Sequence, residues 1–301
     1  MTALWLSLGS AAAEPAASAM LYAARKMYRM AYRNVLNEQA ERPDDPDLHT
    51  QAGVLLTRMG AASDGLASFE LSRGAGSFYA DMGGAGWHAT ALRETGRPLE
   101  AAALRRELLA VTPRKKALSL YGELILDYRA AARLDLAWDA ALEGLSNFPG
   151  APLLAASMAD LCFEMGRFDE MDQWLAESDR GVPEGHFRAH LVRGRVALAD
   201  EDFATARRHG QVLRRRDLTD PDGMAFRFAL EHAENGPAAA LAVADSPVWR
   251  RVQAPQLACL EVLALLDLGH RTEARALAEA LTARYPLRRD VQALQLILNA
   301  P

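Results

Sequence analysis

The 301-residue sequence has little cysteine and few aromatic side chains. Its two cysteines, Cys162 and Cys259, stand far apart and outside any ligand-spaced cluster. This spacing excludes a disulfide framework and a zinc pattern, and it predicts two buried small hydrophobic side chains. Aromatic residues make up only 7% of the chain, and Val and Ile are sparse while Ala and Leu abound. This balance favours helices over sheets.

The chain also has very few lysines and no excess of positive charge. Lysine occurs only at positions 26, 115 and 116, and the formal net charge is -5. Binding to nucleic acid through bulk charge is therefore not expected. No apolar run approaches the roughly 18 residues that a membrane-spanning helix needs, so no integral membrane segment is predicted. The Ala- and Arg-rich, Lys-poor composition is typical of a GC-rich bacterial genome.

Residues 1–18 allow two interpretations. They resemble the apolar part of a signal peptide, with Ala11, Ala12 and Ala13 as a small-residue cleavage site. The basic residues that should come first are missing, because the first is Arg25. The protein is periplasmic or otherwise exported if this segment is a truncated signal peptide. It is cytoplasmic if the segment is a flexible or capping element, and the sequence leaves the compartment open.

One phrase recurs along the chain: a glycine, a few residues, Glu-Ala or similar, an apolar-periodic run and a proline. The stretches Gly96–Pro113 and Gly269–Pro286 both show it with the same spacing. The turn positions advance in steps of 36, 36, 34, 35, 35 and 33 residues; they are Gly60, Gly96, Ala132, Gly166, Glu201, Gly236 and Gly269. A period of this length indicates stacked helix pairs that share one continuous core.

Each repeat is expected to be two helices joined by a tight turn. The turn needs a residue that tolerates positive φ, which explains the dominance of glycine. A small residue five positions later lets the second helix lie close to the first, as at Gly65, Ala101, Ala137, Ala206 and Ala274. A closing proline stops the second helix before the next repeat, as at Pro113, Pro149, Pro183 and Pro286.

This phased set resembles the tetratricopeptide repeat family. The resemblance implies an all-α fold: a right-handed α-solenoid of about seven stacked antiparallel helix pairs over residues 46–286. Residues 19–45 are expected to form an N-terminal helix or degenerate repeat, and residues 287–301 a capping helix. Two departures are visible. Glu201 stands where glycine is usual, and the second helix of the sixth repeat is short.

The stretch 74–88 holds five glycines and raises the question of a phosphate-binding loop. A dinucleotide-binding loop needs a strand before it and a helix after it, and here a helix comes first. The preferred interpretation is a longer joint between two repeats. A patch of small residues that admits a partner's backbone is the alternative.

No motif for catalysis or cofactor binding stands out, so the chain is predicted not to be an enzyme and to need no cofactor, metal or small-molecule substrate. His186 and His190 are spaced i, i+4 and could share a helix face as metal ligands do, but no third ligand is fixed nearby. Ordinary histidines at the surface or between helices are the preferred interpretation.

The family resemblance implies that the first helix of each repeat lines a concave groove. The matching positions that we single out for partner binding are Arg58, Thr90, Arg93, Arg129, Asp160, Phe163, Arg188 and Arg195. One hypothesis is a groove whose arginines grip a peptide or helix with acidic residues. The alternative is that Arg58, Arg93 and Arg129 are solvated, or bridge neighbouring repeats to Glu94 and Asp127.

The expected function is a non-enzymatic scaffold that binds a protein or peptide, within a bacterial assembly related to the envelope or to secretion. The family's chaperone-binding members carry a carboxylate clamp of Lys, Asn and Arg that is absent at the matching positions here. A second hypothesis is an accessory subunit that contacts an enzyme or nucleic acid through the basic run 206–217 on its convex side. That run lacks interleaved aromatic residues, which argues against nucleic acid.

Overall fold

The computed structural model describes residues 27–72, 75–80, 83–182, 185–252 and 254–299. Within these ranges the regular structure is helical throughout and no strand occurs, so the all-α prediction is confirmed. None of the described helices combines the length and apolarity that crossing a bilayer requires. The N-terminal segment predicted at residues 1–18 lies outside the described residues.

The helices pair as the repeat spacing predicts. The seven pairs are α3 (Pro46–Arg58) with α4 (Ala62–Ser72), α6 (Gly84–Glu94) with α7 (Pro98–Val111), α8 (Arg114–Ala130) with α9 (Leu134–Asn147), α10 (Pro152–Glu164) with α11 (Phe168–Asp179), α12 (Phe187–Ala199) with α13 (Phe203–Arg216), α14 (Pro221–Asn235) with α15 (Pro237–Ala244), and α16 (Pro255–Asp267) with α17 (Arg271–Arg284). Helix α2 (Tyr28–Glu41) precedes them and α18 (Arg289–Asn299) follows; α5 (Ser77–Ala80) and the 3-10 turn η1 (Trp249–Arg251) are short additions.

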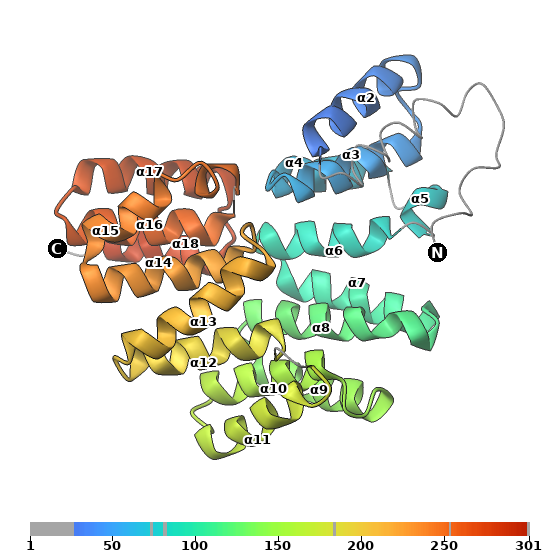
Figure 1. The fold of residues 1–301 in the computed structure, drawn as a ribbon. Coiled ribbons are helices and arrows are strands. Elements are labelled where there is room, and N and C mark those ends of the chain that lie inside the picture. The colour runs from blue at the N-terminus through green and yellow to red at the C-terminus, as the bar shows by residue number, and fades with distance from the viewer. Residues whose placement is uncertain (1–26, 73–74, 81–82, 183–184, 253, 300–301) are drawn as a thin grey trace. The chain divides into compact units, whose positions relative to one another are not determined.

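The chain divides into two compact units, Met1–Leu92 and Arg93–Pro301. In the first unit, α2 and α3 bury a shared core that includes Ala31, Val35 and Leu48. In the second unit, the pairs follow one another around an arc from α7 to α18 (Figure 1), and the first helices of successive pairs pack on each other. No pair closes its own core; each buries its apolar face against its neighbours.

The turn inside every pair has the left-handed backbone that the sequence predicts. The φ angles at the seven turn positions are 81° at Gly60, 91° at Gly96, 54° at Ala132, 70° at Gly166, 59° at Glu201, 85° at Gly236 and 79° at Gly269. Ala132 and Glu201 are the two described non-glycine residues with positive φ. The repeat phase therefore places even these side chains in a conformation that favours glycine.

Close packing of the two helices explains the small residue that stands five positions after the turn in five of the seven repeats. Ala101, Ala137, Ala206 and Ala274 are all fully buried. At Gly65 even a methyl group has no room, because a Cβ atom there would lie 2.5 Å from Oγ1 of Thr57. These five positions confirm the predicted point of contact in their own pairs.

The sixth repeat compensates for its short second helix with a tryptophan. Helix α15 has only eight residues. Trp249 from η1 is 3% exposed, and its ring centroid lies 5.3 Å from that of Phe228 in α14. The indole nitrogen donates a hydrogen bond to Oε1 of Glu261. The indole thus fills core space that a full-length second helix would otherwise cover.

The glycine-rich stretch forms a helical joint in the first unit. Helix α5 is anchored by Asp47, which accepts hydrogen bonds from Oγ of Ser77 (3.0 Å) and the backbone N–H of Phe78 (2.8 Å). Helix α6 begins at Gly84, where a Cβ atom would lie 2.5 Å from the methyl carbon of Thr50. Close approach of α3 to this joint accounts for glycine at position 84.

Replacing Glu201 with Gly should raise the free energy of unfolding by about 1 kcal/mol, because the side chain no longer occupies a left-handed backbone. Asp200→Gly is the matched control: Asp200 has an ordinary φ of -85°, so glycine there should only destabilise. Urea unfolding followed by circular dichroism measures both. A lower midpoint for Glu201→Gly would contradict the prediction.

Candidate interaction surface

The predicted partner-binding residues lie on first helices. Arg58 is on α3 and Thr90 on α6, in the first compact unit. The other six belong to the second unit: Arg93 at the end of α6, Arg129 on α8, Asp160 and Phe163 on α10, and Arg188 and Arg195 on α12. Their surroundings differ strongly from one residue to the next.

In the first unit, Arg58 lies between two aromatic rings. Its guanidinium carbon is 4.6 Å from the ring centroid of Trp87 and 5.5 Å from that of Tyr28. This cation–π arrangement ties α3 to α2 and to α6. Thr90 donates a hydrogen bond from its hydroxyl to the carbonyl of Gly86, one turn earlier in α6 (3.1 Å).

Arg93 joins two repeats through a buried charge cluster. Its Nη1 atom lies 2.9 Å from Oε2 of Glu123 and 3.1 Å from Oδ1 of Asp127, both on α8. The other oxygen of Asp127 accepts a hydrogen bond from Nε of Arg105 on α7 at 2.6 Å. Asp127 is fully buried and Arg105 is 1% exposed. Asp127 therefore lies between two guanidinium groups at the junction of the second and third repeats.

Burial and charge act against each other in this cluster. Burial raises the pKa of Asp127 to about 6, although Arg93 and Arg105 lower it. Burial likewise raises the pKa of Glu123, but the same two arginines outweigh it, and the resulting pKa is below the ordinary value. The cluster is thus held by hydrogen-bonded pairing, and removal of one partner leaves a buried charge uncompensated.

A second cluster joins α8, α10 and α12. Asp160 is 1% exposed and pairs through one carboxylate oxygen with Arg129 and through the other with Arg195 (3.0 Å). Arg129 also pairs with Glu164. Phe163, between these two acids in the sequence, packs edge to face on Phe168, with ring centroids 6.4 Å apart. Three predicted site residues, Arg129, Asp160 and Arg195, therefore form ion pairs with one another.

Arg188 differs from the other arginines of this set. It is half-buried at the start of α12, and its side chain makes no hydrogen bond or ion pair with any residue that the structure describes. The pKa of Glu123 is set mainly by burial, which raises it, and by Arg93 and Arg105, which lower it. The charge of Arg188 lowers this pKa further. Glu123 is on α8, two repeats away, so side chains of non-adjacent first helices face a common space.

The same coupling occurs between α8 and α14. Burial lowers the pKa of Arg129, and Asp160, Glu164 and Asp222 together raise it above its ordinary value. Asp222 belongs to α14, three repeats along the chain. Charged side chains of the first helices α8, α12 and α14 therefore lie within electrostatic range of each other.

Arg105 was not identified from the sequence as part of this surface, although its position within the repeat is one at which other repeats bury a side chain. It stands nine residues after a turn position, where four other repeats place Phe69, Ala141, Leu175 and Ala278, all buried. Asp127 stands five residues before its turn, where other repeats place Leu55, Ala91, Leu161 and Ala264, also buried. A basic and an acidic residue at two repeat positions that are usually buried therefore predict a buried ion pair.

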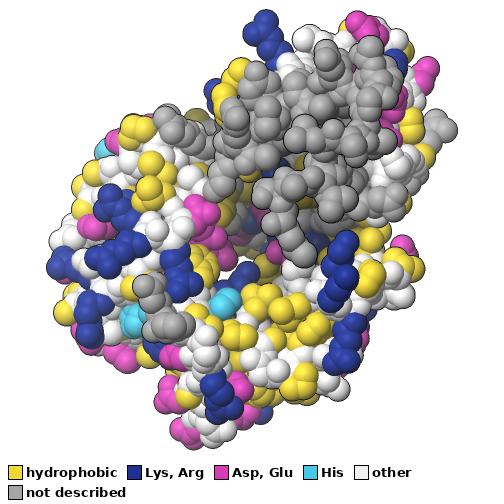
Figure 2. All heavy atoms as spheres, turned by 45° about the vertical axis from the view of Figure 1, so that its right-hand side comes forward, with side chains coloured by type: hydrophobic (Ala, Val, Ile, Leu, Met, Phe, Trp, Pro, Cys, Tyr) yellow, Lys and Arg dark blue, Asp and Glu magenta, His cyan; other side chains and the backbone are white. Residues whose placement is uncertain are grey.

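The basic run 206–217 lies on the second helix α13. Arg214 and Arg215 are exposed and make no hydrogen bond or ion pair to the described part of the chain, whereas Arg207 pairs with Glu234 at 2.6 Å. On the face drawn in Figure 2, Lys and Arg side chains gather at several places with Asp and Glu side chains between them. This surface carries both signs of charge.

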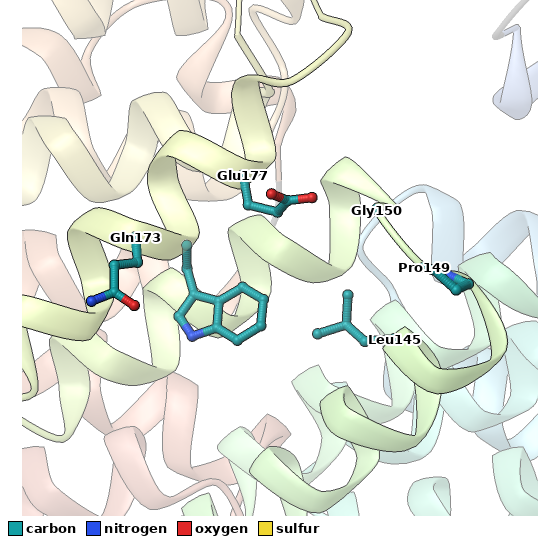
Figure 3. A pocket seen from close by; sticks show the side chains of 6 residues that line it. Leu145, Pro149, Gly150, Gln173 and Glu177 are labelled. Carbon is teal, nitrogen blue, oxygen red and sulfur yellow. The ribbon is translucent and has the colours of Figure 1, made fainter.

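A pocket of about 360 Å³ opens between α9 and α11. Leu145 points into it, and Gln173 and Glu177 approach from α11 (Figure 3). Pro149 and Trp174 complete an apolar lining, while Glu177 is paired with Arg180 at 2.8 Å. Both helices are second helices, so this pocket is separate from the first-helix face.

Comparison with solved structures then identifies the architecture. The APC/C hetero-tetramer Cut9-Hcn1 aligns over 95% of this chain with a TM-score of 0.51 at 14% identity, and the alignment covers 55% of that chain, about half its length. A tetratricopeptide repeat protein from Parabacteroides merdae aligns over 95% of this chain and 98% of its own, with a TM-score of 0.45 at 15% identity. The alignment with Cut9, a tetratricopeptide repeat protein, shows that this chain has the tetratricopeptide repeat fold.

Further similarity is weaker. The pilF protein of Pseudomonas aeruginosa aligns over 71% of this chain and 96% of its own, with a TM-score of 0.39 at 18% identity. No protein-family model matches the sequence, and no curated protein matches it. The tetratricopeptide architecture is thus carried by the fold and the repeat phase.

The histidines and cysteines of this tetratricopeptide fold are structural in their surroundings. Nδ1 of His190 lies 2.9 Å from Nδ1 of His209 on α13, and His186 caps α12 by accepting a hydrogen bond from the backbone N–H of Arg188. Among the described residues no group of three potential metal ligands converges. Both cysteines are buried, as predicted, and burial raises the pKa of Cys162 to about 11.

Asp127→Ala should lower the free energy of unfolding by about 3 kcal/mol or more, because Arg105 stays buried without its carboxylate. Asp135→Ala is the matched control: Asp135 pairs with Arg133 at 2.6 Å, but both side chains are exposed. We expect no measurable change in the control. Chemical unfolding of both variants measures the difference, and equal effects would contradict the buried-cluster interpretation.

Acidification should destabilise the protein through His186 and His209. Burial lowers the pKa of each to about 4, with a further lowering from Arg188 on His186 and from His190 on His209. The unfolded chain, with a histidine pKa of 6.5, binds more protons between pH 6.5 and 4, so stability falls as the pH falls through this window.

The double variant His186→Asn/His209→Asn should show a flatter loss of stability over this window than the wild type. His270→Asn, at an exposed histidine, is the control and should keep the wild-type slope. Urea midpoints measured across the pH range give the slopes. Asp127 has a raised pKa, so its protonation increases stability as the pH falls. This contribution is the same in all three proteins and does not affect the difference between their slopes. Three identical slopes would refute the histidine assignment.

Proposed function

We propose that the protein is a non-enzymatic scaffold that binds a protein partner, as a peptide or a helix, on the concave face of its second compact unit. The mechanism is presentation of a preformed surface. Buried ion pairs hold α8, α10 and α12 in place, so little conformational entropy is lost on the scaffold side when a partner binds.

Arg188 is the observation that carries this proposal. The other arginines of the concave set in the second unit, Arg93, Arg129 and Arg195, already pair with acidic side chains of the chain itself. Arg188 alone among them has a guanidinium without a hydrogen-bonded partner in the described residues. A planar guanidinium on a half-buried surface suits a carboxylate, so we assign acidic residues to the partner.

The remaining residues of the predicted set take supporting roles in this proposal. Arg93, Arg129, Asp160 and Arg195 join the repeats and shape the floor of the face, and Phe163 adds apolar surface beside them. Arg58 and Thr90 stay a prediction for the first unit. No cofactor, metal or small-molecule substrate enters the proposal.

The similar structures support a role in assembly. Cut9 is named as part of a hetero-tetramer with Hcn1, which makes it a protein that works in a complex. We propose a comparable role here, in a bacterial multiprotein assembly of the envelope or of secretion. The bacterial context rests on the Ala- and Arg-rich composition, and the envelope context on the apolar segment 1–18.

A second candidate function uses the opposite side. Arg214 and Arg215 are exposed, unpaired within the described residues and adjacent on α13. They favour an accessory role in which this basic face contacts an enzyme or a nucleic acid. The two candidates place the essential charge on different helices, which makes them separable.

Capture of partners on the immobilised protein, from a lysate of the organism that encodes it, tests both. The baits are wild type, Arg188→Glu and the control Arg214→Glu/Arg215→Glu. Arg93 and Arg129 are left intact because reversing their charge would leave Asp127 and Asp160 buried and unpaired. We expect a protein that binds wild type and the control, and whose affinity for Arg188→Glu is at least about tenfold lower.

Loss from the control variant alone would favour the basic face of α13. A partner retained equally by all three baits would contradict both assignments. Circular dichroism spectra and melting curves of the three baits establish that they are equally folded.

A further inference from the structure

Two turns that are far apart in the sequence meet within the second unit. One is the turn between α6 and α7, which contains Gly96; the other is the turn between α17 and α18, which contains Leu287 and Arg288. Nη1 of Arg288 lies 3.1 Å from Oε2 of Glu94 and donates to the backbone carbonyl of Glu94 at 3.3 Å. These bonds join residues 194 positions apart.

Gly96 brings the two backbones into direct contact. A Cβ atom at this position would lie 2.3 Å from the carbonyl carbon of Leu287 and 2.6 Å from the backbone nitrogen of Arg288. The corresponding turn glycines Gly166 and Gly269 have no atom within 4 Å of a built Cβ. Gly96 is therefore needed for more than its left-handed backbone, because the opposite turn occupies the space beside it.

Arg288 is oriented for this contact by its own turn. Its Nε and Nη2 atoms bond to the two oxygens of Asp290 at 2.9 and 2.6 Å, which directs the remaining Nη1 toward Glu94. The side chain of Arg288 is 14% exposed and that of Glu94 26% exposed. A two-pronged pair with a fixed geometry leaves little freedom in the guanidinium, so the third bond has a defined direction.

The consequence is a closed arrangement of helix pairs. The pairs from α8 to α17 lie in sequence between the two turns, and Figure 1 shows them following an arc whose end returns toward α7. The inward coupling of Arg188 with Glu123 and of Arg129 with Asp222 agrees with strong curvature. An open solenoid would not bring its terminal turn back to its second repeat.

We propose that the contact of Glu94 and Gly96 with Leu287 and Arg288 is a latch that closes the second unit into a ring and whose release opens its concave face. Both sides of the contact are turns, and Leu287 is 53% exposed. The contacts described for this joint are the ion pair and the hydrogen bond of Arg288 with Glu94 and the close backbone approach at Gly96. A joint of this kind opens more readily than packed helices, which share buried apolar area.

The latch is tested by a distance measurement that involves no partner, so its outcome is independent of the proposed function. Spin labels are attached at Val111→Cys on α7 and Leu296→Cys on α18, whose side chains are 79% and 76% exposed. Cys162 and Cys259 are replaced by Ala to restrict labelling to these sites. Double electron–electron resonance then gives the distribution of distances between the two helices.

We expect one narrow distribution for the otherwise native chain. Gly96→Ala should shift it to longer and broader distances, because the methyl group cannot fit beside Leu287. Gly166→Ala is the matched control: it places the same strain on a left-handed turn residue in open space, so the distribution should not change. Circular dichroism establishes that both variants keep their helices.

Arg288→Gln is a second, independent variant that removes the ion pair and leaves the Gly96 approach intact. It should broaden the distribution, and added salt should have the same effect on the native latch, since the pair is partly exposed. A distribution that is the same in Gly96→Ala, Arg288→Gln and Gly166→Ala, or one that is already broad in the native chain, would overturn the proposal.

Discussion

The structure depends on one local constraint that recurs along the chain: the second helix of each pair starts from a left-handed residue and then packs closely on the first. The left-handed backbone at the turn reverses the chain in the fewest residues, and in five of the seven repeats a buried alanine or glycine five positions later lets the helices approach closely. Ala132 and Glu201 adopt this backbone although their side chains oppose it. Stacking of the neighbouring pairs therefore outweighs a local cost of about 1 kcal/mol.

Charge takes over part of the stacking at the junction of the second and third repeats. Where other repeats bury leucine, alanine or phenylalanine, these two bury Arg105 against Asp127. Such a pair gains little net stability over an apolar contact, but it is intolerant of the loss of one partner. It also has a functional consequence, because arginines that join repeats have little capacity left for a partner. Arg188, which has no hydrogen-bonded partner among the described residues, is the distinctive group of the proposed binding face for this reason.

Gly96 is required both by its local turn and by a contact between distant parts of the second unit. Its positive φ belongs to the local turn, as in every repeat, while its missing side chain admits a backbone from the other end of the second unit. A ring closed in this way limits how a partner reaches the inward-facing charges. The curvature of the second unit and the accessibility of its charges are thus linked through a single contact.

The sequence by itself determined the helical class, the number of pairs, the seven turn positions and the buried small residues, because these follow from short-range rules that act within one repeat. It also identified both cysteines as buried. The tertiary structure alone decided which arginines are paired and that Arg288 meets Glu94. Ion pairing depends on distances between residues of different repeats, and closure depends on the small rotation between successive pairs summed over the arc. Neither quantity is encoded in the pattern of any single repeat.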